Sequence, residues 1–497
     1  MERPLTRYER SLRSVANLLN TDLSRDDVMI SGLTQSSQDI EPGDLFLAFP
    51  GAKTHGARYC IEAKERGALA VLTDAAGAEI LNELVDDFPK VVVRDPRRSA
   101  GILSAWFYGE PMRDMYSVGI TGTNGKTTTT TLLYQIWNMA GRESGLIGTV
   151  ETRIGRDLLQ SKRTTPESSD LQALVATMRE RHVRNLAMEV SSHAISLERI
   201  RGSHFAVVAF TNLTQDHLDF HGTMEEYFLA KASLFASEYA DLGVINIDDP
   251  YGARLAESTL IPVRTLSRTN QKADWNYVSA YPHFRGNDVV IRGLGGILIE
   301  GLLPLHGDYN LDNALMAVAL AYESGVDPME IAAILPTLSG AQGRLEPVVV
   351  GQDFGAFVDY AHSPDAVSRV LEACRSMTSG KVIAVLGCGG DRDPLKRPLM
   401  GSALANGSDV AVFTNDNPRS EDPLKILDQM THGLSISLPD QVIPDRKTAI
   451  EYAVSQASSG DIVVVLGKGH ETGQETAGVV IPFDDRLMLA QAIEGRT

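Results

Sequence analysis

Cysteine is scarce in this sequence, and long apolar runs are missing from it. The 497 residues include three cysteines, Cys60, Cys374 and Cys388, which share no paired spacing. This excludes a disulfide framework or a cysteine-based zinc site and favours a reducing compartment. No apolar run reaches about 18 residues, and the first residues contain no apolar signal core. We therefore expect a cytoplasmic protein with no membrane insertion.

Positive charge is also in short supply. The chain has 46 Lys and Arg against 64 Asp and Glu, a formal net charge of −18. Nucleic acids and anionic membrane surfaces are bound by basic faces, so the balance argues against either partner. An anionic ligand would need a pocket that is locally positive.

Short β-rich runs fall into three groups along the chain. The first contains "GDLFLAF", "ALAVLT" and "KVVVRD" and ends at a Gly/Pro-containing break, "YGEPMRD"; the pattern restarts once more after "GAQGRLEPV". A chain of this length exceeds one hydrophobic core. We predict three α/β domains: a smaller N-terminal domain over residues 1–112, a central P-loop-type domain with a mostly parallel sheet over 113–342, and a C-terminal Rossmann-like domain over 343–497.

Polar clusters follow the strand-like runs of the last two groups. Centrally, "SVGI" leads into "TGTNGKTT", "NLAM" into "EVSSH" and "FAVVAF" into "TNLTQDHLDFHG". Later, "GAFV" leads into "DYAHSPD", "VIAVLG" into "CGGDRD" and "DIVVVLG" into "KGHET". Ligands of open α/β sheets collect at the carboxyl ends of the strands. We therefore expect one ligand-binding rim on each of these two sheets.

The segment "GTNGKTT" suits a phosphate. Its N–H groups can surround phosphate oxygens at a helix N-terminus; the residues concerned are Gly122, Thr123, Asn124 and Gly125. Lys126 would reach the β- and γ-phosphates of ATP, and Thr127 or Thr128 would hold Mg²⁺. The motif is shorter than a strict Walker A sequence, because Ile120 stands five residues before Gly125. An ordinary turn remains the alternative.

Six segments together resemble the Mur ligase family: "TGTNGKTTT", "MEVSSHA", "TNLTQDHLDFHG", "INIDDP", "GDYNLDN" and "DYAHSPD". The resemblance extends from about residue 31 to residue 485. It implies an ATP-dependent ligase that phosphorylates a carboxylate and lets an amine attack the acyl phosphate, which gives an amide, ADP and phosphate. The order and spacing are most similar to the family member that joins meso-diaminopimelate to UDP-N-acetylmuramoyl-L-alanyl-D-glutamate.

The resemblance also implies a metal site. Glu189 and His217 would bind Mg²⁺ beside Thr127, although carboxylate is the more usual ligand and a hydrogen-bonding loop histidine is the alternative for His217. Lys231 matches the family lysine that CO₂ converts to a carbamate near the metal; without the resemblance it would be a solvated helix lysine. We expect His193 and His221 to be structural or to support the ligands.

The nucleotide contacts implied by the resemblance come from two domains. Asn310 would contact the adenine, whereas Arg344 and Asp359 would contact the ribose and phosphates. For Asn310, with Asn313 near the start of a helix, capping is the alternative. ATP would then lie between two domains that close over it.

UDP-substrate binding is implied for the N-terminal domain and the adjoining loops. Where the family usually has Leu-Asp-Ser-Arg, this chain has Gln35 to Gln38, so Ser37 alone is retained. The other candidates, each with a surface polar residue as the alternative, are Lys53, Thr54, Thr164, Thr165, Ser191 and Arg199.

The last domain would bind the amino acid. The candidates are Arg392, Asp416, Asn417, Pro418, Arg419, Gly467 and Glu471. Guanidinium suits the carboxylates of a zwitterion, and carboxylate suits its ammonium. Arg419 stands where lysine-adding relatives usually have a neutral residue, so it would select meso-diaminopimelate; a turn arginine after Asn-Pro is the alternative.

Other functions stay open at this stage. They are a lysine-adding or other Mur-type ligase, a folylpolyglutamate-type ligase, and a P-loop NTPase switch that forms no amide. The second polar rim, with its zwitterion-like charges, argues against a switch. We expect a monomer that binds the UDP-linked dipeptide and meso-diaminopimelate and no nucleic acid.

Overall fold

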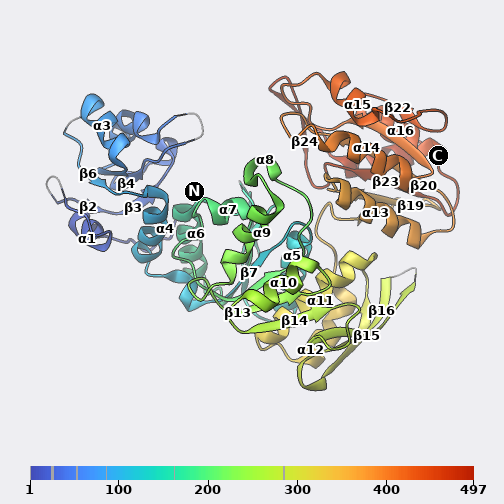
Figure 1. Cartoon of the computed structure of the whole chain (residues 1–497), viewed down its shortest axis with the longest axis horizontal. Coiled ribbons are helices and arrows are strands. Elements are labelled where there is room, and N and C mark those ends of the chain that lie inside the picture. The colour runs from blue at the N-terminus through green and yellow to red at the C-terminus, as the bar shows by residue number, and fades with distance from the viewer. Residues whose placement is uncertain are drawn as a thin grey trace.

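The structure is a computed structural model that describes residues 2–23, 27–51, 54–85, 87–161, 163–283 and 286–496. Three main sheets lie in three successive parts of the chain (Figure 1). The helices and strands alternate within each part, which confirms the predicted α/β class. No helix in these described ranges is long and apolar enough to cross a membrane.

The N-terminal part holds a parallel sheet in the order β3-β4-β5-β6. Its strands are β3 (Gly32–Thr34), β4 (Asp44–Leu47), β5 (Ala70–Thr73) and β6 (Lys90–Val92). Its helices are α1 (Leu12–Leu18), α2 (Cys60–Glu65), α3 (Ala75–Leu84) and α4 (Pro96–Phe107), and β1 (Arg10–Ser11) pairs with β2 (Met29–Ile30). The three runs predicted as strands are β4, β5 and β6.

The segment that connects the N-terminal part to the central part is packed against the central part. Residues Pro111–Asp114 form a 3-10 helix, and Met112 is buried. The guanidinium of Arg179 donates to the carbonyls of Tyr108 and Gly109. The break that the sequence indicates at residues 108–114 is therefore fixed against the central part.

The central sheet has the order β10-β9-β8-β11-β7-β12-β13-β14-β15-β16-β17. It is parallel from β8 to β15 and antiparallel at both edges. The strands are β7 (Tyr116–Thr121), β8 (Ser144–Ile147), β9 (Thr152–Ile154), β10 (Asp157–Leu159), β11 (Asn185–Glu189), β12 (Phe205–Phe210), β13 (Ala240–Asn246), β14 (Val263–Ser267), β15 (Trp275–His283), β16 (Gly286–Arg292) and β17 (Leu298–Leu303). The helices are α5 (Lys126–Met139), α6 (Ser168–Glu180), α7 (Ser192–Ser196), α8 (Leu218–His221), α9 (Met224–Ala232), α10 (Pro250–Ser258), α11 (Asp308–Glu323) and α12 (Pro328–Ile334).

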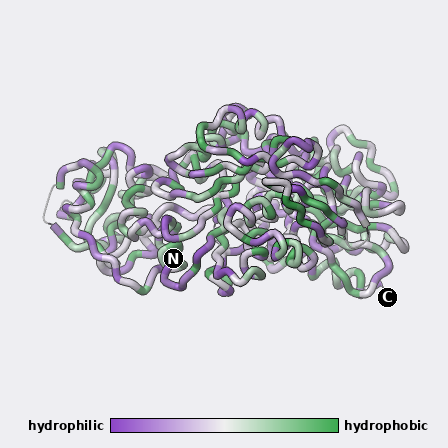
Figure 2. The backbone as a smooth tube through the Cα atoms, turned by 90° about the horizontal axis from the view of Figure 1, so that it is seen from below, coloured by the Kyte–Doolittle hydropathy of each residue, from purple (hydrophilic) through white to green (hydrophobic). Residues whose placement is uncertain are grey.

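The C-terminal sheet has the order β18-β19-β23-β20-β21-β22. Its strands are β18 (Glu346–Pro347), β19 (Gly355–Asp359), β20 (Val382–Cys388), β21 (Val410–Asn415), β22 (Gln441–Val442) and β23 (Ile462–Leu466), and β24 (Gly473–Thr476) pairs separately with β25 (Val479–Pro482). The helices are α13 (Pro364–Met377), α14 (Lys396–Gly407), α15 (Pro423–Thr431), α16 (Arg446–Gln456) and α17 (Asp485–Glu494). Strands β20 and β23 are buried along their whole length, as doubly covered parallel strands are. Figure 2 shows that hydrophobic stretches of the chain (green) run through the interior of the molecule.

A buried ion pair joins the first residues of α16 and α17. The Arg446 guanidinium donates to both carboxylate oxygens of Asp485, at 2.8 and 2.7 Å, and both side chains are 0% exposed. Arg446 also donates to the carbonyls of Asn415 and Leu466 at the ends of β21 and β23. The pair therefore ties two helices to the edge of the sheet where the strands end.

Asp485→Ala should lower the free energy of unfolding of the C-terminal part by about 3–5 kcal/mol, because it leaves a buried guanidinium without its counter-charge. Native-state hydrogen exchange in β23 would measure the change. Glu451→Ala is the control, since it breaks an exposed 3.8 Å pair with Lys447 on the same helix. That change should cost less than about 1 kcal/mol. Equal effects of the two substitutions would contradict the role given to the buried pair.

Candidate active site

The glycine-containing loop connects β7 to α5 at the carboxyl edge of the central sheet. Gly122 has φ 147° and Gly125 has φ 86°, in the region that favours glycine. A Cβ on Gly122 would overlap Thr211 Oγ1, and one on Gly125 would overlap Asn313 Oδ1. The loop thus keeps its close approach to the neighbouring segments only with glycine at both places.

Lys126 begins α5 and bends back over this loop. Its Nζ donates to the carbonyls of Gly122 and Thr123, each at 2.8 Å. Burial lowers the pKa of Lys126, although the charge of Glu189 acts in the opposite direction. The lysine is therefore held over the loop by two neutral carbonyl groups. Charged phosphate oxygens would form stronger hydrogen bonds with its ammonium group.

Glu189, the last residue of β11, lies beside the start of α5. Its carboxylate accepts hydrogen bonds from Thr127 Oγ1 at 3.1 Å and from the Thr149 N–H and hydroxyl at 2.8 and 3.1 Å. Glu189 is 1% exposed. The carboxylate and the hydroxyl give two oxygen ligands of the kind that Mg²⁺ prefers, and Mg²⁺ commonly takes its remaining ligands from nucleotide phosphates and water. The described residues form no cluster of three or more acidic, His or Cys side chains for a metal.

Lys231, on α9, contacts the same loop. Its Nζ donates to the Gly122 carbonyl at 2.8 Å and lies 4.7 Å from the centre of the Tyr227 ring. Burial, followed by the charge of Lys126, holds the pKa of Lys231 well below its usual range. The lysine is 1% exposed, so the structure rules out the solvated helix lysine that the sequence left open.

His217 lies at the start of α8 with φ 54°. Its Nε2 is 3.5 Å from the Asp216 carboxylate, and its ring centre is 4.7 Å from that of His193. Burial lowers the pKa of His217 to about 4, although Asp216 acts in the opposite direction. A neutral imidazole is the form that can bind a metal. His221 instead pairs with Ser192 Oγ at 2.9 Å inside the fold.

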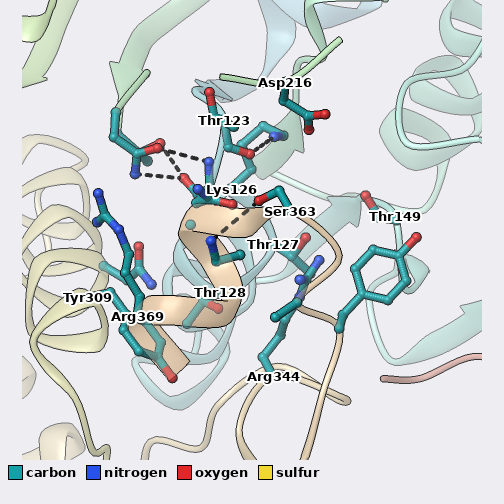
Figure 3. A pocket seen from close by; sticks show the side chains of 18 of the residues that line it. Thr123, Lys126, Thr127, Thr128, Thr149, Asp216, Tyr309, Arg344, Ser363 and Arg369 are labelled. Carbon is teal, nitrogen blue, oxygen red and sulfur yellow. Dashed lines mark hydrogen bonds between the residues drawn. The ribbon is translucent and has the colours of Figure 1, made fainter. Parts of the chain in front are cut away.

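A cavity of 250 Å³ lies over the loop and is lined from both the central and the C-terminal parts. We call it the phosphate cavity, after the phosphate that the loop is expected to bind. The central residues among the candidates are Thr123, Asn124, Gly125, Lys126, Thr127, Thr128, Thr164, Glu189, Ser191 and His217. Arg344 and Asp359 line it from the C-terminal side. Figure 3 shows Arg344, Ser363 and Arg369 gathered around the loop residues.

The two C-terminal candidates are fixed by different contacts. Asp359 ends β19 and accepts hydrogen bonds from the N–H groups of Leu345 and Ala361 at 2.6 and 2.7 Å. Burial raises the pKa of Asp359, against the effect of the Arg344 charge. The Arg344 guanidinium lies 4.6 Å from the centre of the Tyr360 ring. A planar cation on an aromatic ring leaves its edge free to donate to a ligand.

Asn310 does not line this cavity. Its amide donates to the His306 carbonyl at 2.9 Å and its oxygen accepts from Asn313 at 3.4 Å. The neighbours on α11 that do line the cavity are Tyr309, Asp312, Asn313 and Met316. The capping alternative also fails, because Gly307 holds the cap position and Asn310 lies inside the helix.

A second cavity, of 660 Å³, gathers most of the residues predicted to bind an amino acid. They are Arg392, Asp416, Asn417, Arg419, Gly467 and Glu471; Pro418 does not line the cavity. Asn417 donates to Glu471 at 2.7 Å, and Arg419 donates to the Gly390 carbonyl at 2.7 Å while its Nε lies 3.7 Å from Glu475. Cations and carboxylates therefore face one space, as a zwitterion requires.

The two cavities adjoin. They share the lining residues Thr164, Asp216, His217, Tyr360 and His362. A group held over the phosphate loop would thus be next to a group held by the C-terminal rim.

The candidates for the UDP substrate lie in two places. Ser37 donates to Glu62 at 2.9 Å within the N-terminal part, and the Thr54 carbonyl accepts from Gly51 N–H at 3.0 Å. Lys53 lies outside the described residues. Thr165 donates to the Glu189 carbonyl at 2.9 Å, Ser191 caps α7, and Arg199 forms an ion pair with Glu167 at 3.0 Å. Of these, Ser191 lines the phosphate cavity together with Thr164, whereas Thr165 and Arg199 do not line it.

Sequence reasoning missed several residues that line the phosphate cavity. Tyr309, Arg369 and Thr149 are the clearest cases. Arg369 lies on α13 at i+4 from Asp365, the last residue of the quoted segment "DYAHSPD", so helical spacing from that segment could have identified it. Thr149 follows a strand that the sequence analysis did not identify.

Comparison with known proteins places the chain in a family. Family models match residues 29–104 ("Mur ligase family, catalytic domain"), 120–321 ("Mur ligase middle domain") and 343–469 ("Mur ligase, glutamate ligase domain"). A UDP-N-acetylmuramoyl-L-alanyl-D-glutamate--2,6-diaminopimelate ligase of Streptomyces coelicolor is 47% identical, covering 99% of this chain and 98% of that protein. A protein of the same name from Corynebacterium glutamicum is 43% identical, covering 93% and 92%.

Solved structures agree with this assignment. A ligase of the same name has a TM-score of 0.68 at 30% identity, covering 97% of this chain and 99% of that chain. A folylpolyglutamate synthase of Mycobacterium tuberculosis has a TM-score of 0.62 at 17% identity, covering 75% and 93%, which shows the fold alone. The matched domains and the full-length relatives lead to one conclusion: the chain belongs to the Mur ligase family.

Proposed function

We propose that this protein is the ATP-dependent ligase that adds meso-diaminopimelate to UDP-N-acetylmuramoyl-L-alanyl-D-glutamate in peptidoglycan synthesis. The observation that carries the proposal is the shared wall of the two cavities, because it puts a phosphate site beside a zwitterion site. The relatives of 47% and 43% identity support the identity of both substrates through their names.

The two lysines, the loop and the cavity wall suit the first half of the reaction. ATP would lie with its phosphates over Gly122 to Thr128, and the carboxylate of the UDP-linked dipeptide would attack the γ-phosphorus, giving an acyl phosphate and ADP. Thr127 and Glu189, with His217, would hold Mg²⁺, which when bound neutralises phosphate charge. Lys126 would leave its two carbonyl partners for phosphate oxygens. Catalysis of this kind rests on position and charge.

The second half needs an amine at the shared wall. The C-terminal rim would hold the amino acid with its amino group directed toward Asp216 and His217. Attack on the acyl carbon forms the amide and releases phosphate. We place the protein, with its nucleotide substrates, in the cytoplasm and propose that it acts as a monomer.

Release of ADP, measured with the UDP-linked dipeptide and a panel of amino acids, tests the proposal. It should require both substrates and should be fastest with meso-diaminopimelate. ADP release that is independent of any amino acid would favour an NTPase without ligase activity.

Lys126→Ala should lower the rate of ADP release by roughly 10²-fold or more, because the lysine charge acts most strongly on the charge that develops during phosphoryl transfer. Lys272→Ala, at an exposed lysine of the same central part, serves as the control and should leave the rate unchanged. A near-normal rate in Lys126→Ala would remove the phosphate-loop assignment.

Lys231 should carry a carbamate in the active enzyme. The lowered pKa supports this, since only an uncharged amine can add CO₂, with loss of one proton. Incubation with ¹³C-bicarbonate should give a carbamate NMR signal that is lost in Lys231→Ala and retained in Lys272→Ala. Lys231→Ala should be nearly inactive and partly restored by short carboxylates. Full activity of the variant, or of the protein freed of CO₂, would contradict the carbamate.

Arg419→Ala should lose most of the preference for meso-diaminopimelate over lysine. The side chain lines the amino-acid cavity, and a charge-assisted contact to the distal carboxylate is worth roughly 1.5–3 kcal/mol, or on the order of 10- to 150-fold. The ratio of kcat/KM for the two amino acids measures it. Arg392→Ala is the comparison, because a contact to the carboxylate common to both amino acids would lower both values together. An unchanged ratio in Arg419→Ala would show that another residue selects.

A further inference from the structure

Three arginines converge on one carboxylate where the N-terminal part meets the central part. Glu167 lies 3.0 Å from Arg199, 3.2 Å from Arg163 and 3.8 Å from Arg97. The Gln35 amide also approaches the same carboxylate, at 3.5 Å. We call Arg97, Arg163, Arg199 and Glu167 the junction cluster.

The members of the junction cluster come from separate elements. Arg97 lies in the first turn of α4, which packs against α6, and Arg199 follows α7. Figure 1 shows α4, α6 and α7 next to one another at this boundary. Arg97 also lies over the Phe49 ring, at 5.4 Å from its centre, and donates to the Pro50 carbonyl. The cluster thus depends on the way in which the two parts are packed together.

Positive charge exceeds negative charge in the junction cluster. In the described ranges, Glu167 is the one carboxylate that forms an ion pair with any of its three guanidiniums. Arg199 is only 12% exposed, and its Nε has no hydrogen-bond partner. Burial lowers the pKa of Arg199, and the charges of Arg163 and Arg97 act in the same direction. One carboxylate therefore does not neutralise the three guanidiniums, and the excess positive charge favours a more highly charged anion in its place.

The Glu167 side chain does not cap the helix that it precedes. It holds the N-cap position of α6, but its side chain makes no cap hydrogen bond. Serine, threonine, aspartate or asparagine at that position would stabilise the helix. The carboxylate is turned toward the arginines instead.

The junction cluster adjoins the phosphate cavity. Arg163 directly precedes Thr164, which lines both cavities, and Arg199 donates to the Thr165 carbonyl at 3.4 Å. Arg163 is 54% exposed, so the cluster is open to ligands on that side. A long anionic substrate that extends from the N-terminal part to the phosphate loop would pass the cluster.

We propose that Glu167 occupies an anion subsite of the UDP-linked substrate, and that a substrate oxyanion displaces its carboxylate from Arg97, Arg163 and Arg199. The inference rests on the proposed function for the identity of the substrate. The displaced group is matched in chemistry by two parts of that substrate, the diphosphate and the free carboxylate of its D-glutamyl residue. Because the subsite is filled by the protein itself, the apparent affinity is reduced by the fraction of molecules in which it is filled.

Removal of the internal anion should therefore tighten binding. In calorimetry with UDP-N-acetylmuramoyl-L-alanyl-D-glutamate, Glu167→Gln should lower the Kd roughly fivefold or more. Asp157→Asn is the matched control, since it removes a carboxylate from an exposed 2.9 Å pair with Arg181 and should leave the Kd unchanged. Glu167→Asp keeps the charge but shortens the side chain, and should also lower the Kd. A Kd in Glu167→Gln that is unchanged or higher overturns the proposal.

A second variant tests the proposal independently, in case Glu167→Gln does not fold. Arg163 is more than half exposed, so Arg163→Gln should fold, and it should raise the Kd roughly five- to 20-fold through loss of a charge-assisted contact. An unchanged Kd in this variant overturns the proposal independently.

Shorter ligands identify the part of the substrate that binds. If the gain in Glu167→Gln is already present with UDP, the diphosphate is the displacing group; if it needs the D-glutamyl residue, the carboxylate is. If Glu167→Gln binds neither UDP nor the complete UDP-linked dipeptide more tightly than the unmodified protein does, the subsite is overturned. These binding measurements require neither the amino acid nor catalysis. If the protein binds the UDP-linked dipeptide but Glu167→Gln does not bind it more tightly, the subsite is wrong and the proposed ligase function is unaffected. Failure of the unmodified protein to bind that dipeptide overturns both.

Discussion

Two buried lysines meet at one backbone carbonyl, and the chemistry of the site depends on that meeting. Lys126 and Lys231 both donate to Gly122 O, and burial lowers the pKa of each. Because both lysines contact the same carbonyl oxygen, both can be charged at once only if negative charge lies nearby. Phosphate oxygens, a carbamate on Lys231 and the Glu189 carboxylate each meet that need. The loop is therefore locally positive, as the proposed nucleotide site requires, although the chain as a whole carries −18.

A similar balance of local charge is found at two other places in the molecule. The C-terminal cavity sets Arg392 and Arg419 against Asp416 and Glu471, and the junction cluster sets three arginines against Glu167. Each site is polar enough to select an ionic group and is placed where two parts of the chain meet. Sites between domains can be assembled or opened by small movements of those domains.

Much of the fold follows from local pattern. Buried parallel strands such as β20 and β23 are continuous apolar runs, and the polar segments after them lie at their carboxyl ends. Helix α5 ends at Met139, and Gly141, with φ 71°, follows the C-cap residue Ala140, at the position where glycine commonly ends a helix. The antiparallel edge formed by β9 and β10 was less predictable, because each of these strands is only three residues long. Short edge strands carry too little periodic pattern to be identified.

The sequence by itself determined the glycine-containing loop, the succession of strands and polar clusters along the chain, and the residue types of both rims, since these are properties of consecutive residues. Only the tertiary structure decided which of them meet. It brought Arg344 to the loop, left Asn310 outside the cavity, and turned Glu167 away from its helix toward Arg97, which is 70 residues earlier in the chain. Such contacts depend on how separate sheets and helices pack, and packing between distant segments leaves no periodic signal in the sequence of either one.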